Sequence, residues 1–129
     1  MEKTHTNPWK WQDARNYVQA VEVKNVTGTL YVSGQTAISD DGISSDADMR
    51  TQIALAIANL EKVITQAGYE VKNIARLNIF TTDHDEFFND FDVFQDWVSA
   101  NGIKTTITCL QVVKLFETLK VELEATVVN

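Results

Sequence analysis

Several short stretches of the chain alternate apolar and polar residues, and this alternation predicts β-strands. The clearest lies at 120–128, where Val121, Leu123, Ala125 and Val127 occupy every second position and polar residues fall between them. A period of two is typical of a half-buried strand, because successive side chains point to opposite faces of a sheet. By the same reasoning, strands are predicted at 17–23, 29–33, 74–81 and 105–113.

Two longer segments repeat their apolar residues every three or four positions, which predicts amphipathic helices. The first runs from Ile53 to Ala67 and is followed by Gly68, a natural C-terminal cap. Ser45 and Asp48 are three residues apart and are expected to cap the start of this helix. The second helix has its apolar stripe at Phe87, Phe91, Phe94 and Val98.

These elements follow one another in the order ββαβαββ, which predicts an α+β domain at 17–129 after an irregular N-terminal arm at 1–16. The first two strands are expected to form a hairpin through the turn residues at 25–28. Right-handed crossovers place both helices on one face of a single mixed sheet. The other face, which carries Glu122 and Glu124, is left bare, and this predicts association with further copies of the chain.

Composition and charge exclude several classes of function. The chain has 129 residues and a net charge of −7, so its surface repels nucleic acid. It has no N-terminal signal-like segment and no apolar run long enough to span a membrane, and its one cysteine, Cys109, fits a reducing compartment. We therefore expect a cytoplasmic protein without membrane contact. No nucleotide or zinc motif is present, so no cofactor or metal is expected, and His84 is expected in a helix-capping turn.

Four short motifs resemble the RidA/YjgF family, which is also described as endoribonuclease L-PSP. They are the tyrosine strand 17–21, the turn Ser33-Gly34-Gln35, the helix residues Gln52, Asn59, Leu60 and Ala67-Gly68, and the closing strand 121–125. Their order and spacing carry the resemblance, which covers 17–128. It implies a chorismate-mutase-like fold, a homotrimer, and three small-molecule clefts at the subunit interfaces. The activity it implies is the hydrolysis of imines and enamines.

The resemblance also implies which residues form the site. In the family, an arginine and a backbone amide of the Ser-Gly-Gln turn hold a substrate carboxylate, and a glutamate on the last strand orients water. Carried over position by position, the water-orienting residue is Glu122. The substrate-binding positions are Tyr17, Ser33, Gly34, Phe91, Ile107 and Cys109.

Two of these positions depart from the family pattern. Ile107 stands where the family has its arginine, and Phe91 stands where the family often has an asparagine. Each ionic hydrogen bond of an arginine contributes about 1.5–3 kcal/mol, and isoleucine contributes none. We therefore predict a substrate that is less anionic or more apolar. Lys104 and Lys114 are the nearest substitute cations, although Lys104 is expected on the opposite strand face and Lys114 beyond the strand.

Alternative interpretations remain open for several residues. Glu122 and Glu124 project in parallel about 7 Å apart, as a water-orienting pair or as a solvated or trimer-lining pair. Cys109 is a cleft-lining residue, an inert apolar residue or, least favoured, a nucleophile. Trp9 and Trp11 either pack on the domain surface or form an aromatic wall beside a ligand. The function is accordingly either a deaminase with an altered substrate or a non-catalytic, metabolite-binding or regulatory trimer. The acidic charge disfavours a ribonuclease.

Overall fold

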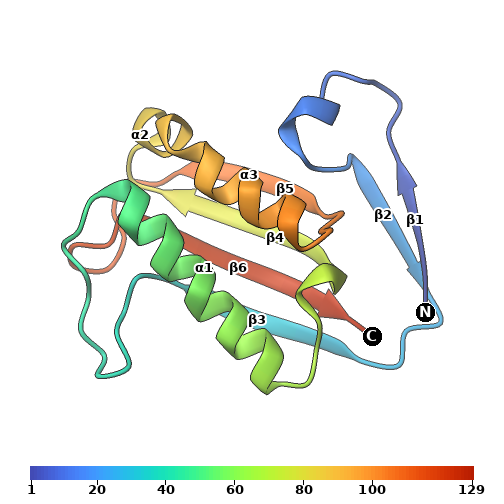
Figure 1. Cartoon of the computed structure of the whole chain (residues 1–129), viewed down its shortest axis with the longest axis horizontal. Coiled ribbons are helices and arrows are strands. Elements are labelled where there is room, and N and C mark those ends of the chain that lie inside the picture. Colours follow the sequence, from blue (N-terminus) through green and yellow to red (C-terminus); the bar gives the residue numbers. More distant parts are fainter.

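A four-stranded sheet covered on one face by helices forms the body of the molecule, and a separate two-stranded ribbon stands beside it (Figure 1). The computed structural model describes residues 1–129. Its strands are β1 (Glu2–Thr6), β2 (Ala20–Lys24), β3 (Thr29–Gln35), β4 (Ile74–Thr81), β5 (Thr106–Gln111) and β6 (Val121–Val128). Its helices are the 3₁₀ turns η1 (Asp13–Arg15) and η2 (Val71–Asn73), and the α-helices α1 (Met49–Gln66), α2 (His84–Asn89) and α3 (Phe91–Ala100).

The main sheet is mixed, as predicted. Its strand order is β3-β6-β4-β5, with β4 and β5 parallel and the other neighbours antiparallel. The alternation at 121–127 places Val121, Leu123 and Val127 in the core beneath the helices. The intervening Glu122 and Glu124 are only half-buried, because they point to the other face.

The sheet is not single, which corrects the predicted hairpin. The strand β2 pairs with β1 in an antiparallel ribbon, whereas β3 pairs with β6. Residues 2–6, expected to be irregular, thus form a strand. Apart from Lys3, their side chains are exposed, so they carry no apolar alternation that the sequence pattern could reveal. Alternation in β2 predicted a strand correctly, but it contains no information about the pairing partner.

The helices begin differently from the prediction. Asp48 caps α1 by accepting a hydrogen bond from the Thr51 amide at 2.9 Å, whereas the hydroxyl of Ser45 accepts one from the Ala47 amide. The expected Ser45–Asp48 capping box is therefore wrong. The second predicted helix is divided at Asp90, whose backbone (φ −107°, ψ 17°) is not helical. The apolar stripe continues across this break, so the break is not visible in the hydrophobic pattern.

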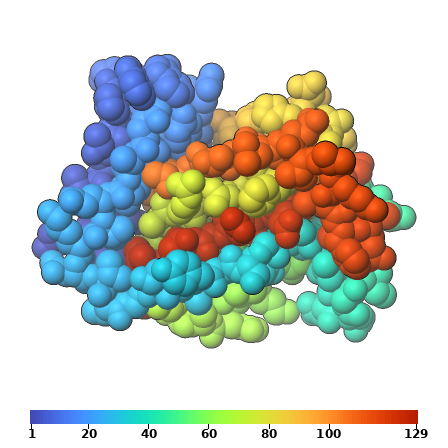
Figure 2. Space-filling model, turned by 180° about the vertical axis from the view of Figure 1, so that it is seen from behind, coloured from blue at the N-terminus to red at the C-terminus, as the bar shows by residue number.

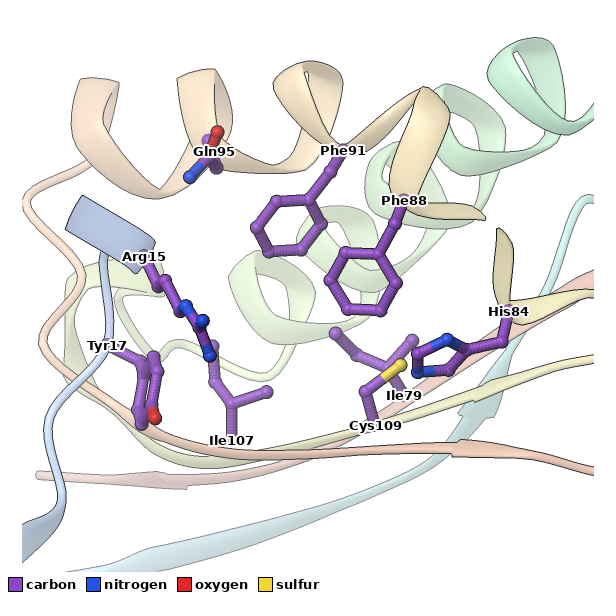
Figure 3. Close-up of a pocket in the computed structure, with 9 residues that line it drawn as sticks. All are labelled: Arg15, Tyr17, Ile79, His84, Phe88, Phe91, Gln95, Ile107 and Cys109. Atoms are coloured by element: carbon purple, nitrogen blue, oxygen red, sulfur yellow. The ribbon is translucent and has the colours of Figure 1, made fainter. Parts of the chain in front are cut away.

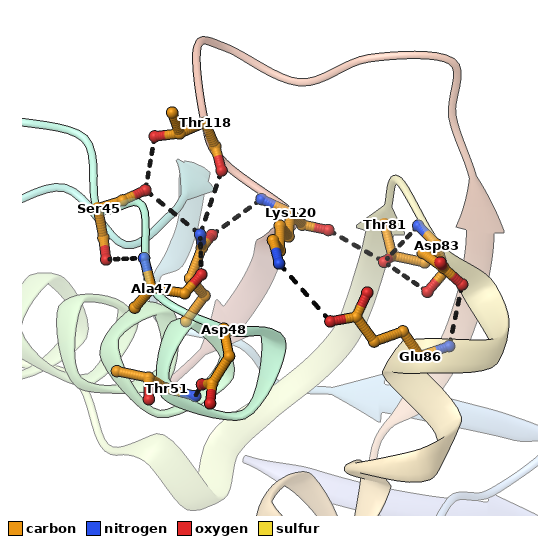
Figure 4. A network of polar contacts seen from close by, with 10 residues as sticks. Ser45, Ala47, Asp48, Thr51, Thr81, Asp83, Glu86, Thr118 and Lys120 are labelled. Atoms are coloured by element: carbon orange, nitrogen blue, oxygen red, sulfur yellow. Dashed lines mark hydrogen bonds and ion pairs between the residues drawn. The ribbon is translucent and has the colours of Figure 1, made fainter.

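A buried glutamine ties α1 to two loops and to β6. The side chain of Gln52 donates to the carbonyls of Ser45, Ala47 and Thr118 at 3.1–3.3 Å, and its oxygen accepts from the Lys120 amide at 2.8 Å. These partners surround the start of α1 in Figure 4. Because buried backbone groups need hydrogen-bond partners, this residue fixes the loops that enter α1 and β6.

The second face of the main sheet has no helix over it. Seen from behind, the four strands lie open side by side (Figure 2). Tyr31 is 80% exposed and Leu110 is 51% exposed on these strands, so apolar area remains uncovered. No helix of the molecule is long and apolar enough to cross a membrane.

Candidate functional site

A hollow of about 550 Å³ lies between the edge strand β5 and the helices α2 and α3, and the segment around η1 closes one end of it (Figure 3). We call it the helix-side pocket. Its middle is apolar. The side chains that make this apolar part are Ile79, Phe88, Phe91, Ile107 and Cys109.

Polar groups stand at the two ends of the helix-side pocket. Arg15, Tyr17 and Gln95 lie at one end, and His84 lies at the other (Figure 3). The His84 ring packs against the Phe88 ring, with 4.6 Å between centroids. The pocket therefore combines an apolar body with a few polar groups, as is typical of small-molecule sites.

Three hydrogen bonds hold the N-terminal segment over the pocket. The Gln95 side chain donates to the Ala14 carbonyl at 3.2 Å, and the Asn16 side chain donates to the Ser99 hydroxyl at 3.0 Å. The Val18 amide donates to the Thr105 carbonyl at 3.0 Å, just before β5. Asn16 ends η1 in the left-handed region (φ 58°), which asparagine tolerates better than most residues. These contacts fix Arg15 at the pocket mouth.

The two tryptophans of the N-terminal segment form an aromatic cluster behind Arg15. The Trp9 and Trp11 rings stack with centroids 5.9 Å apart, and Trp11 meets Tyr17 edge-on at 6.5 Å. The Arg15 guanidinium lies 5.5 Å from the Trp11 ring centroid, within the range of a cation–π interaction. The tryptophans support residues of the pocket but are not among those that line it.

Cys109 lies on the floor of the pocket and is half-buried. Burial raises the pKa of its thiol to about 11, because the thiolate is less well solvated there. The thiol is therefore protonated at neutral pH, which supports its interpretation as a lining residue and disfavours a nucleophile.

The predicted residues Ser33, Gly34 and Glu122 lie together elsewhere, on the open face of the sheet. We call them the open-face cluster. The register of β3 against β6 shifts between Val32 and Gln35, so a β-bulge lies at Ser33 and Gly34. A side chain at Gly34 would put its Cβ 2.6 Å from the carboxyl carbon of Glu122. Glycine therefore allows this close approach of the backbone to the carboxylate, and a larger residue would require the Glu122 side chain to move.

The acid of the open-face cluster has a perturbed pKa. Burial and, secondly, the neighbouring charge of Glu124 raise the pKa of Glu122. Glu124 accepts a hydrogen bond from the side-chain nitrogen of Asn78 at 3.0 Å, while the side-chain oxygen of Asn78 is buried without a partner. Perturbed carboxylates are enriched at functional sites, and this one combines burial with a specific neighbour.

The predicted site residues thus fall into two groups on opposite faces of one sheet. Tyr17, Phe91, Ile107 and Cys109 line the helix-side pocket, whereas Ser33, Gly34 and Glu122 form the open-face cluster. The expectation that Ile107 and Glu122 face the same hollow is wrong within one chain. The register explains why. Ile107 pairs with the buried Leu77 and Glu122 pairs with Phe80, and these two partners are three positions apart on β4, so their side chains point to opposite faces.

The cation of the pocket is one that the sequence interpretation missed. Neither Lys104 nor Lys114 lines the helix-side pocket, but Arg15 does. Lys104 lies on the side of the ribbon, where burial and the charges of Lys3 and Lys104 lower the pKa of His5. The one sequence signal for Arg15 was its position two residues before the predicted site residue Tyr17.

No group of three or more His, Cys, Asp or Glu side chains is close enough to hold a metal ion. His84, flanked by Asp83 and Asp85, occupies the start of α2, where Asp83 caps the helix by accepting from the Glu86 amide at 3.0 Å. The predicted capping turn is confirmed.

Comparisons with known proteins find relatives along most of the chain. The sequence model of the family described as endoribonuclease L-PSP matches residues 10–129. The putative reactive intermediate deaminase TdcF of Escherichia coli K12 is 27% identical over 114 residues, covering 88% of this chain and 86% of TdcF. The 2-iminobutanoate/2-iminopropanoate deaminase of the same organism is 25% identical over 114 residues, covering 88% of this chain and 87% of that protein.

Solved structures match the fold. E. coli TdcF with bound serine is 28% identical and has a TM-score of 0.73, covering 88% of this chain and 87% of that chain. YyfB of Yersinia pestis, from the conserved Rid family, has a TM-score of 0.79 at 23% identity and covers 100% of both chains. The predicted α+β fold is confirmed by these likenesses.

Proposed function

Because the chain belongs to the RidA/YjgF family, described as endoribonuclease L-PSP, we propose that it is a homotrimeric deaminase that hydrolyses imines or enamines in clefts between subunits. One observation carries this proposal. The helix-side pocket and the open-face cluster lie on opposite faces of a single chain, so they can form one site only if different chains contribute them. The open face, with exposed Tyr31 and Leu110, offers the surface for that association.

In this proposal each group has its own task. The helix-side pocket of one subunit binds the apolar part of the substrate, and the open-face cluster of its neighbour supplies the chemistry. The Gly34 amide donates to a substrate oxygen, and Tyr17 shapes the cleft or donates a proton. Glu122 accepts a proton from water as the water oxygen bonds to the imine carbon. Glu122 then returns this proton to the substrate nitrogen, the hydroxyl of the carbinolamine loses its proton as the C–N bond breaks, and the products are ammonia and a carbonyl compound.

The raised pKa of Glu122 supports its role in proton transfer. A carboxylate with an ordinary pKa of about 4.3 is a weak base at neutral pH, and the best general bases have a pKa near the working pH. Burial and the charge of Glu124 shift Glu122 in that direction. Glu122 is also the one predicted site acid adjacent to the bulge at Gly34, where a substrate can approach the backbone.

A non-catalytic metabolite-binding trimer is the second candidate. The observation that favours it is that the helix-side pocket is complete within one chain, whereas hydrolysis needs Glu122 from another. Binding without turnover therefore needs residues of one chain only, whereas catalysis needs residues of two chains.

A direct assay separates the two functions. The protein is mixed at pH 8 with freshly generated 2-iminobutanoate or 2-aminoacrylate, and release of the keto acid is followed against the spontaneous reaction. A deaminase accelerates release, and Glu122→Gln lowers the acceleration about 100-fold or more, as expected for loss of a general base. Glu70→Gln, which removes a carboxylate that is exposed and remote from both groups, serves as the control.

Three outcomes contradict the proposal. A molecular mass from light scattering that corresponds to a monomer would mean that no cleft is shared between subunits. Full activity in Glu122→Gln removes the assigned chemistry, and no acceleration with any imine leaves the binding trimer as the function.

A further inference from the structure

The Arg15 guanidinium is a cation without a protein partner. It lies at one end of the helix-side pocket, beside Tyr17 and above Ile107 (Figure 3). None of the six ion pairs of the molecule involves it, whereas Arg50 is paired with Asp90 and Asp92. The Trp11 ring lies 5.5 Å from the guanidinium and leaves its charge uncompensated. An arginine fixed at the mouth of a pocket and free of carboxylates is available to an anionic ligand.

The chemistry of the guanidinium restricts the kind of ligand that it can bind. A guanidinium stays charged at all relevant pH values and presents paired N–H donors that match the two oxygens of a carboxylate. Tyr17 and Gln95 stand at the same end and can add neutral hydrogen bonds. The Trp11 ring behind Arg15 limits the directions that the side chain can take, which reduces the entropy that it loses on binding.

The apolar part of the helix-side pocket further restricts the size and polarity of the ligand. From Arg15, the cavity continues over Ile107 and Cys109 toward the rings of Phe88 and Phe91. These two rings are 4.9 Å apart between centroids at 37°, so their edges form a concave aromatic surface. A volume of about 550 Å³ exceeds the needs of a two- or three-carbon side chain and matches a bulkier ligand.

We propose that Arg15 anchors the carboxylate of an imino or enamino acid whose side chain is aromatic or bulky and apolar, with that side chain lying against Phe88 and Phe91. That the ligand is an imine or enamine rests on the proposed deaminase function. That it carries a carboxylate and an aromatic or bulky side chain is inferred from the helix-side pocket alone. It replaces the expectation of a less anionic substrate. The anchoring cation comes from the N-terminal segment instead of from position 107.

Equilibrium binding tests the anchor without catalysis. The probes are 3-phenylpropanoate, its neutral amide and propanoate, titrated by calorimetry at pH 8 and low salt. We expect the wild type to bind 3-phenylpropanoate at least tenfold more tightly than either other probe. Arg15→Gln should lose tenfold or more for the carboxylate and nothing for the amide, and Arg15→Lys should lose less. Lys104→Gln, which removes a cation outside the pocket, should leave binding unchanged.

Turnover tests the same residue in the reaction. Imines are generated from phenylalanine, leucine and alanine by an amino-acid oxidase in the presence of catalase, and keto acid release is measured. We expect the highest kcat/KM for the phenylalanine- or leucine-derived imine, and a tenfold or larger loss in Arg15→Gln carried mainly by KM. Arg15 is exposed, so its replacement should leave the fold intact, which circular dichroism verifies.

The outcomes separate the inference from the function on which it rests. Binding that depends on Arg15 in a protein without turnover keeps the anchor and refutes the deaminase. Turnover and carboxylate binding that are unchanged in Arg15→Gln refute the anchor and keep the deaminase. Equal handling of phenylalanine- and alanine-derived imines, with equal binding of 3-phenylpropanoate and propanoate, refutes the aromatic selectivity.

Discussion

The helix-covered face of the main sheet and its open face differ in the kind of chemistry that they offer. The helix-side pocket is an apolar hollow with a fixed cation at its mouth and a protonated thiol on its floor. The open-face cluster is polar and flat, and it holds an acid with a raised pKa against a glycine. One face is suited to hold a molecule and the other is suited to move a proton. In the proposed function, a single chain therefore separates binding from chemistry, and association of chains joins them.

The largest effect should come from mixing two inactive variants. Glu122→Gln keeps the helix-side pocket and loses the acid, whereas Cys109→Trp fills the pocket and keeps the acid. Each should be at least about 100-fold less active than the wild type. Heterotrimers purified through two different tags should recover about a third of the activity, because a cyclic trimer of mixed composition contains one intact site in three.

Circular dichroism and light scattering of each variant are the controls for this mixing experiment. Recovery requires that pocket and acid come from different chains. Mixed trimers as inactive as their parents would place the whole site within one chain and contradict the proposed cleft.

Gly34→Ala should disturb the open-face cluster alone. The added methyl group would lie 2.6 Å from the carboxyl carbon of Glu122, so that side chain has to move. A displacement of about 1 Å can cost up to 100-fold in rate, and we expect a loss of about 10- to 100-fold in keto acid release. Binding of 3-phenylpropanoate in calorimetry should change much less than the rate, because Arg15 and the rings of the helix-side pocket hold this ligand and alanine keeps the backbone amide at position 34.

A shorter acid should restore part of this loss. Gly34→Ala combined with Glu122→Asp leaves room for the methyl group and should be more active than Gly34→Ala alone. A double variant that is no better than the single variant would show that the glycine acts otherwise than by admitting the acid.

The Cys109 thiol should react slowly with iodoacetamide. With its pKa raised to about 11, it has very little thiolate at pH 8. The greater nucleophilicity of a more basic thiolate compensates only in part, so alkylation should be about 20-fold slower than for an ordinary cysteine. The rate, followed by mass spectrometry, should rise with pH and fall when 3-phenylpropanoate fills the pocket. An ordinary rate at pH 8 would contradict a buried pocket floor.

The smallest expected effect is a shift in the acid limb of the pH–rate profile. Glu122 acts as a base only when it is ionised, so turnover should fall as the pH is lowered through its raised pKa. Glu124→Gln removes the lesser of the two causes that raise this pKa, so the limb should move to lower pH. A limb that moves to higher pH, or a profile that Glu124→Gln does not alter, would contradict the assignment.

Elements with one buried face were predictable from the sequence. Val121, Leu123 and Val127 alternate with polar residues because one side of β6 packs under the helices, and Gly68 ends α1 with a positive φ of 82°. Pairing was not predictable in the same way. The alternation in β2 is equally compatible with β1 or β3 as a partner, and β1 itself shows no apolar pattern because most of its side chains are exposed.

The arrangement of the candidate site residues was not predictable from the sequence, and their membership of a site stays a prediction. Which face Ile107 and Cys109 share depends on the register of β5 against β4, and a strand pattern leaves that register undetermined. Arg15 escaped notice because η1 is a single turn within a segment that has no periodicity. Its direction is set by tertiary hydrogen bonds from Gln95 and Asn16, which local sequence cannot reveal.

The position of Arg15 outside the main sheet has a consequence for how this protein diversifies. The position of a cation on a strand is fixed by the pairing of that strand with its neighbours. Arg15 instead lies on η1, which is joined to the rest of the molecule by a few contacts at α3 and just before β5. Insertions or substitutions in the segment between β1 and β2 can therefore change which ligand is preferred while the main sheet and its helices keep their structure. Mutant libraries confined to this segment should yield folded proteins with altered ligand selectivity.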